Sequence, residues 1–286
     1  MTALDDEFSS ELGPSAWAGS VGSRWANNLD YLEATLENVA DGILDHANFM
    51  PGETVVEIGC GGGAFTQLVA ARVKPGGSVL GIDISDELIA IASRRAHAKQ
   101  IGNLDFQTAD ASEARPASAP FDRLVSRFGV MFFPDADKAM RNLHRLLKPG
   151  GRLDFAVWAT AAENAQFLLT ATIADHLEVE RPAPGAPGPL AFSDPSHVRT
   201  LLTNAGFSSI AIERWQGALC SGTPDMDARE VAERIIGASG FADALVKADA
   251  KVRKAVIDEA VETLTPYLTP QGVRLPATVL LVTAFA

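Results

Sequence analysis

The sequence has few of the features that would place it in a specialised class of protein. It contains only two cysteines, Cys60 and Cys220, so it offers neither a disulfide framework nor a zinc site. No apolar run approaches the length of a membrane span, and the acidic first residues differ from the positively charged start of a secretory signal. From these absences we expect a soluble, cytoplasmic protein without a metal site.

Basic side chains are also in short supply. The 24 lysines and arginines are outnumbered by 36 acidic residues, which gives a net charge of −12, and no run of basic residues stands out. This balance disfavours a broad contact with DNA or RNA. The 47% of apolar residues is ample for one sizeable core. We therefore expect a small-molecule partner, no nucleic acid and no membrane, and the sequence is compatible with a homodimer.

The rest of the chain is organised around residues 54–65. An apolar, β-branched run at 55–58 predicts a buried parallel strand, and an apolar helix is expected over 64–73. Between them, glycines at alternate positions allow a tight turn that can approach a ligand closely: Gly59, Gly61 and Gly63. The amide groups at the start of the helix would point at that ligand.

Glycine spacing alone leaves two interpretations open. Gly59-x-Gly61-x-x-Ala64 also fits the fingerprint of dinucleotide-binding folds, which would make the protein a nicotinamide-dependent oxidoreductase. Glu57, two residues before the first glycine, favours a ligand with a positively charged amino group instead. A third interpretation is a protein that binds a cofactor without catalysing a reaction.

Glu57-x-Gly59-x-Gly61-x-Gly63 resembles the first motif of the class I S-adenosylmethionine-dependent methyltransferases. Residues 121–134 resemble the fourth-strand block of the ubiquinone/menaquinone-type (methyltransferase type 11) enzymes. The resemblance covers 50–160 with specific motifs and is weaker over 161–270. It implies S-adenosyl-L-methionine as the cofactor and methyl transfer to a small molecule as the activity.

Two further acids follow the next two predicted strands. Asp83 lies 20 residues past Gly63, at the end of a strand over 78–84, where a carboxylate can accept from both ribose hydroxyls. Capping of the next helix is the alternative role, although Ser85 is already a good cap. The resemblance places Asp110 at the adenine amine, beside the Ala111 backbone. Its cofactor-binding positions also include Cys60, Ile84 and Ser126.

Strands expected over 104–108, 121–126 and 152–158 complete five alternating strand–helix units. This order predicts an α/β fold with a doubly wound parallel sheet and right-handed crossovers. Ligands bind beyond the carboxyl ends of such strands. That rule selects Glu57, Asp83, Asp110, residues 126–128 and Trp158 from topology alone. The apolar segment 276–285 resembles the antiparallel seventh strand of the class I methyltransferases.

We divide the single domain into four parts. Residues 1–50 form an N-terminal helical segment, 51–160 the S-adenosylmethionine-binding core, 161–272 cap helices and the completion of the sheet, and 273–286 the final strand. One amphipathic helix is expected over 28–48 and another over 241–264. Trp17 and Trp25 either pack in the core or close over the cofactor. The proline–glycine run 181–189 is either a lid or a plain surface connection.

No catalytic residue is assigned from the sequence. His144, His176 and His197 are the candidate general bases, ahead of His46 and His97, but a structural or exposed role fits each histidine better. Arg127 either attracts an anionic substrate or pairs with an acid. Two cysteines are too few for arsenic methylation. The aromatic residues near the fourth and fifth strands favour an apolar or aromatic acceptor, methylated on carbon or oxygen: Phe128, Phe132, Phe133 and Trp158.

Overall fold

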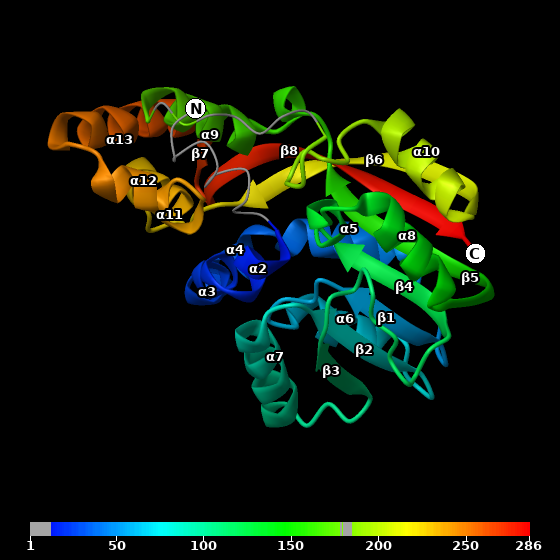
Figure 1. Ribbon diagram of the computed structural model, residues 1–286. Helices are drawn as coiled ribbons and strands as arrows, with labels where there is room; N and C mark the ends of the chain where they lie inside the picture. Colours follow the sequence, from blue (N-terminus) through cyan, green and yellow to red (C-terminus); the bar gives the residue numbers. More distant parts are fainter. Residues whose placement is uncertain (1–12, 178, 180–184) are drawn as a thin grey trace.

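A computed structural model of the chain describes residues 13–177, 179 and 185–286. Figure 1 shows a twisted sheet with helices around it and a helical cap at one end. Among the described residues, no helix combines the length and apolar character that a bilayer crossing requires.

The sheet runs in the order β3-β2-β1-β4-β5-β8-β6, and the short β7 pairs with β8 beside it. Strands β1 to β5 are parallel, whereas β8 is antiparallel to both β5 and β6. The predicted doubly wound seven-stranded sheet with an antiparallel last strand is therefore confirmed. The strands are β1 (Thr54–Ile58), β2 (Ser78–Asp83), β3 (Leu104–Thr108), β4 (Phe121–Arg127), β5 (Leu147–Trp158), β6 (Ser208–Cys220), β7 (Leu268–Thr269) and β8 (Gly272–Phe285).

The central strand β1 is buried because it lies between β2 and β4. Val55 and Val56 are fully shielded from solvent, as their β-branched side chains predict for a strand covered on both faces. Glu57 pairs in register with Gly81 of β2 and Val125 of β4. The carboxyl ends of these three strands therefore lie side by side, and the loops that follow them share one edge of the sheet.

Helices cover both faces of the sheet. Figure 1 shows α8 (Ala136–Arg145) and α10 (Pro195–Ala205) in front of the strands and α5 (Glu37–Ala47) behind them. The other crossover helices are α6 (Ala64–Arg72) and α7 (Asp86–Ala98). Ser85 and Asp135 cap α7 and α8 as expected, because their side chains accept from the amides of Leu88 and Lys138.

The N-terminal segment is divided into short helices. After α2 (Pro14–Ala18) and α3 (Ser20–Asn27), the chain forms α4 (Leu29–Thr35) and only then α5. The single helix predicted over 28–48 is therefore wrong. Leu36 leaves the helical region at φ −97°, ψ 9°, and the Thr35 hydroxyl donates to the Tyr31 carbonyl in the preceding turn. Such a bond competes with the helix and favours a bend.

The cap is formed by α9 (Ala165–His176), α11 (Ala228–Ala238), α12 (Ala242–Lys247) and α13 (Ala250–Leu264). The helix predicted over 241–264 is two helices, because Asp249 caps a new helix by accepting from Lys251 and Val252. Part of the proline–glycine run 181–189 lies outside the described residues. In Figure 1 the α2–α4 helices lie between the cap and the β1–β3 half of the sheet.

An ion-pair network crosses the sheet away from the site. Arg123 of β4 donates to Asp154 of β5 at 2.9 Å, to Glu53 at 2.7 Å and to the Ala47 carbonyl at 2.6 Å. Asp154 is fully buried and also accepts from Arg152 and from the Thr283 hydroxyl of β8. The network therefore joins α5, β4, β5 and β8, and its charges are paired and hydrogen-bonded, as buried charges must be.

Candidate active site

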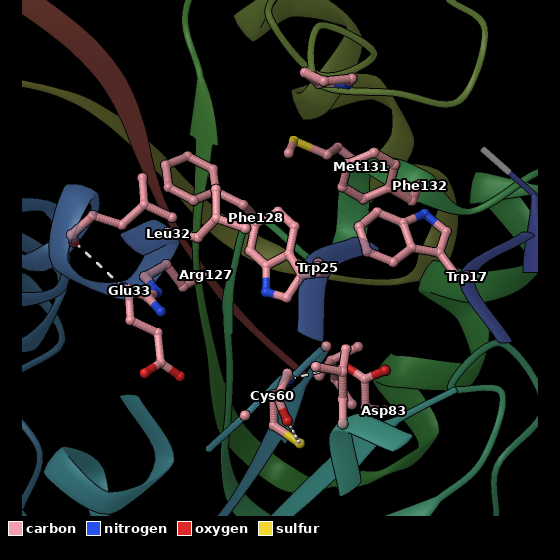
Figure 2. A pocket seen from close by; sticks show the side chains of 18 of the residues that line it. Trp17, Trp25, Leu32, Glu33, Cys60, Asp83, Arg127, Phe128, Met131 and Phe132 are labelled. Atoms are coloured by element: carbon pink, nitrogen blue, oxygen red, sulfur yellow. Dashed lines mark hydrogen bonds between the residues drawn. The ribbon is translucent and has the colours of Figure 1, made fainter. Parts of the chain in front are cut away.

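A cavity of about 370 Å³ lies beyond the carboxyl ends of β1, β2, β4 and β5. Residues of α2–α4 line it on one side, and residues of α9 and α11 line it on another. Figure 2 shows side chains of the N-terminal helices, among them Trp17, Trp25 and Leu32, together with side chains of the core around this cavity. The cavity is therefore built from the core, the N-terminal helices and the cap together.

The glycine turn after β1 forms the floor of this cavity. Gly59, Gly61 and Gly63 all have left-handed φ values, of 69°, 54° and 78°, which glycine adopts at little cost. A Cβ on Gly59 would lie only 2.8 Å from the Cα of Gly129, so β1 and β4 approach each other closely here. Backbone conformation favours glycine at all three positions, and space also requires it at Gly59 and at Gly63, where a Cβ would lie 2.8 Å from the Phe106 ring.

Glu57 is a buried carboxylate with unused hydrogen-bonding capacity. Its side chain is 1% exposed, and Oε2 accepts no hydrogen bond in the described part of the chain. Burial raises the pKa of Glu57 from 4.5 to about 8, and the nearby Thr66 hydroxyl and Arg127 guanidinium partly offset this effect. An orphaned buried acceptor costs about 1–3 kcal/mol, which a cationic ligand would recover.

Asp83 ends β2 and faces the same cavity. Its two carboxylate oxygens accept from the amides of Gly61 at 2.8 Å and Ser85 at 3.0 Å, so it fixes the glycine turn against α7. Burial raises the pKa of Asp83, although these backbone amides act in the opposite direction. Ser85 caps α7, as noted above, so the capping alternative does not account for the position of Asp83.

Asp110 and Ala111 lie in the loop after β3 and also line the cavity. Asp110 Oδ1 accepts from the Ser112 amide at 2.8 Å. The side-chain amide of Asn142 on α8 donates to the Ala111 carbonyl at 2.9 Å and holds the loop in place. The loop therefore presents Asp110 to the cavity from a fixed position.

The structure brings eight of the nine predicted cofactor-binding residues to the cavity: Glu57, Gly59, Cys60, Gly61, Asp83, Ile84, Asp110 and Ala111. Ser126 does not line it. The Ser126 hydroxyl donates to the Ile58 carbonyl at 2.7 Å and accepts from the Gly129 amide at 3.2 Å, and the residue is fully buried. Its visible contribution is to hold the β1 and β4 ends together.

Aromatic residues of the N-terminal helices cover the glycine turn. Trp25 lies over it, with Nε1 3.7 Å from the position of a Cβ on Gly61. Trp17 contacts Trp25 with ring centroids 5.9 Å apart and meets Phe132 edge-on at 4.8 Å. The Trp17 indole nitrogen is buried without a partner among the described residues. Both tryptophans face the cavity in Figure 2.

The opposite wall is aromatic. Phe128 and Trp158 stack with ring centroids 4.1 Å apart and planes 11° apart, and Phe167 of α9 meets Trp158 edge-on. Phe128 holds this position with a left-handed φ of 64°, a strained conformation for a bulky residue. Strain of this kind is tolerated where the surrounding structure demands it, most often at functional sites.

Sequence reasoning did not identify the cavity residues contributed by α4, by the cap and by the neighbouring ends of β6 and β8. They arrive from distant segments and carry no local motif, so only the tertiary arrangement reveals them: Glu33, Gln166, Thr170, Ser221, Ile235, Ser239 and Leu275. Glu33 is held by Arg95 of α7 at 2.8 Å.

None of the five histidines lines the cavity, and all five lie in the described part of the chain. His176 pairs with Glu259, and His46 contacts the Thr283 hydroxyl. His144 packs edge-on against Phe207, and His197 meets Phe192.

Arg127 does line the cavity, where Glu57 and Glu33 raise its pKa against the larger lowering by burial. Its charge therefore faces two acids. Within the described ranges, no cluster of three or more potential ligands could hold a metal ion.

The strand order and the position of the cavity define a class I methyltransferase fold. Residues 55–151 match the sequence model of a methyltransferase domain family. The predicted resemblance to the S-adenosylmethionine-dependent methyltransferases and the predicted cofactor are therefore confirmed over the matched residues. The match ends at Gly151, before the cap.

Named relatives agree with this class. The chain is 31% identical over 115 residues to the nocamycin O-methyltransferase of Saccharothrix syringae, covering 40% of this chain and 41% of that protein. It is 32% identical over 111 residues to the ubiquinone/menaquinone C-methyltransferase UbiE of Pasteurella multocida, covering 38% and 41%. The matched region therefore spans less than half the length of these relatives.

A solved structure with a similar fold is the [4+2]-cyclase SpnF. It superposes with a TM-score of 0.53 and 21% identity, over 86% of this chain and 80% of that one.

Proposed function

We propose that the protein transfers a methyl group from S-adenosylmethionine to a small apolar or aromatic molecule. The observation that carries this proposal is one cavity lined by three acids, a glycine turn and several aromatic side chains. The curated relatives named above act on small molecules by their names, which agrees with the proposal. The atom methylated is carbon or oxygen.

The three acids of the cavity fit the three parts of the cofactor. The orphaned, buried Glu57 carboxylate suits the cationic amino group, because a charge-assisted bond would satisfy Oε2. Asp83 retains lone pairs for the two ribose hydroxyls, and Asp110 suits the adenine amine. When bound, the cofactor supplies an electrophilic methyl group on a sulfonium. The protein aligns the acceptor with that methyl group and excludes water from the cation.

Calorimetry with the purified chain tests the cofactor. We expect micromolar binding of S-adenosylmethionine and none of NADH; the reverse result would support the oxidoreductase alternative. Binding alone is insufficient, because a cyclase has a similar fold. Transfer of a radiolabelled methyl group to an extract of small aromatic compounds separates an enzyme from a protein that only binds the cofactor.

Asp83→Ala tests the ribose assignment. We expect at least tenfold weaker cofactor binding, the scale of one lost charge-assisted hydrogen bond. Asp86→Ala is the matched control, because Asp86 is an exposed acid three residues further along, in the first turn of α7. If the two variants bound the cofactor with equal affinity, Asp83 would not contribute to cofactor binding.

A further inference from the structure

The ionisable residues of the cavity are unevenly distributed. In the part of the chain that the structure describes, four carboxylates line it, Glu33, Glu57, Asp83 and Asp110, together with Tyr31, Cys60 and Arg127. No lysine or histidine does so. Among the described lining residues, only these groups could take a proton from a methyl acceptor.

Three of the four carboxylates already accept hydrogen bonds, and the fourth, Glu57, faces a positive charge. Glu33 accepts two bonds from Arg95 at 2.8 and 2.9 Å, and Asp83 accepts the two backbone amides described above. Asp110 accepts the Ser112 amide, and Glu57 faces the Arg127 charge. Under the proposed function, Glu57, Asp83 and Asp110 also hold the cofactor. None of them is left to serve as a base for the acceptor.

Cys60 and Tyr31 are equally unsuited to take a proton. Burial raises the pKa of the Cys60 thiol well above its usual range, and the neighbouring Asp83 and Glu57 charges raise it further. Burial raises the pKa of Tyr31 to about 12, although Thr35 and Arg234 act in the opposite direction. At neutral pH both groups keep their protons, so neither accepts another.

The aromatic wall adds a second constraint. Phe128, Trp158 and Phe167 present ring faces and edges to the acceptor end of the cavity, and these suit a flat apolar body. An anion in such surroundings is costly unless an opposite charge is close. The sulfonium of the bound cofactor would supply that charge at the point of reaction.

Building on the proposed function, we propose that the acceptor is a compact aromatic molecule with an acidic hydroxyl, a phenol or its enol equivalent, which enters the site already ionised. A lone pair of the acceptor oxygen forms the new C–O bond to the methyl group. The C–S bond breaks, and its electron pair stays on sulfur. The products are a neutral methyl ether and a neutral thioether, and the proton has already left to solvent before binding.

A series of phenols tests this inference. With saturating S-adenosylmethionine carrying a radiolabelled methyl group, kcat/KM is measured between about pH 6 and pH 10 for 4-nitrophenol, 4-cyanophenol, methyl 4-hydroxybenzoate and 4-methylphenol, whose acidity falls in that order. We expect the profiles of the three more acidic phenols to rise about tenfold per pH unit below the pKa of each phenol and then level off, whereas that of 4-methylphenol, with a pKa of about 10, should still rise at the top of the range. Midpoints that move with the phenol support the inference; one midpoint shared by all four phenols would overturn it.

Tyr31→Phe sharpens the test. Tyr31 is a lining residue whose ionisable group can be removed without changing a carboxylate, the glycine turn or Arg127, so this variant tests directly that Tyr31 takes no proton. Whatever the variant does to KM, we expect the midpoint for each phenol to stay unchanged. A kcat reduced more than about a hundredfold, with the pH rise abolished, would identify a general base and contradict the inference.

Failure of this inference differs from failure of the proposed function. If none of the four phenols is methylated while calorimetry shows tight cofactor binding, the acidic-hydroxyl assignment is wrong and methyl transfer to another class of acceptor stands. If S-adenosylmethionine itself does not bind, the proposed function is wrong as well.

Discussion

At the scale of single residues, Glu57 determines how the site responds to pH. Its pKa of about 8 lies above its ordinary value of 4.5, so between these two pH values the folded chain holds a proton that the unfolded chain has lost. The contribution of Glu57 to stability therefore falls as pH rises through this window and is constant above it. The cofactor's ammonium group favours the ionised form, so binding must release this proton.

We therefore predict that S-adenosylmethionine binds more tightly as pH rises from about 6 to about 8, by up to about tenfold per pH unit. Calorimetry in two buffers with different ionisation enthalpies should show about one proton released per cofactor at pH 6. The Glu57→Gln variant should bind S-adenosylmethionine weakly, and its binding should show neither the pH dependence nor the proton release. Proton release that persists in Glu57→Gln would assign it to another group.

Gly59 and Gly52 form a matched pair for testing the glycine turn. Both have positive φ, of 69° and 90°, but a Cβ on Gly59 would meet the Gly129 backbone at 2.8 Å, whereas a Cβ on Gly52 would meet nothing within 4 Å. Gly52→Ala should cost about 1–2 kcal/mol of stability and leave cofactor affinity unchanged. Gly59→Ala should reduce stability by more than Gly52→Ala does, and it should weaken cofactor binding at least tenfold. Denaturant melts and calorimetry measure the two effects, and equal affinities would show that the close approach is unimportant.

At the scale of elements, the N-terminal helices lie over the glycine turn, and an ion pair joins them to the cap. Arg24 of α3 donates to Asp243 of α12 at 2.9 Å, and the Asp243 side chain is 73% exposed. Exposed pairs contribute only about 0–1 kcal/mol, so this contact can tune the closure of the cavity but cannot enforce it.

Arg24→Gln should therefore speed cofactor dissociation by less than about tenfold in stopped-flow experiments, with little change in the association rate. Asp243→Asn should have the same effect, and the double variant should add nothing. Additive effects of the two single variants would show that the pair does not act as one contact.

The core elements are predicted better than the N-terminal helices and the cap. Buried β-branched runs such as 55–58 identify the parallel strands, because the periodicity of a fully buried strand is a local property. The breaks at Leu36 and Asp249 were missed, since each depends on a side chain that binds a backbone group nearby. Most of the cavity floor was predicted from the glycine turn and the acids. Its walls, from Gln166 to Leu275, were not, because they are assembled by tertiary contacts.

At the scale of the whole molecule, the Arg123–Asp154 network ties together strands that are distant in sequence. Asp154→Asn should destabilise the fold by about 3–5 kcal/mol, because it removes the fully buried one of the two carboxylates that pair with Arg123. The folded fraction should keep its cofactor affinity, since the network lies away from the cavity. Asp258→Asn, in an exposed pair with Arg229, is the control and should cost less than about 1 kcal/mol. Urea titrations compare the two, and similar losses would contradict a special role for the buried pair.

The tryptophans provide an optical consequence of this architecture. Of the four indole rings in the chain, those of Trp17, Trp25 and Trp158 border the cavity, whereas Trp215 lies against Gly42 and Gly217 elsewhere. Occupation by an adenine-containing molecule should therefore quench and shift most of the intrinsic emission, and a steady background should remain from Trp215. Intrinsic tryptophan fluorescence should therefore report ligand binding in the cavity, so affinities can be measured without a label.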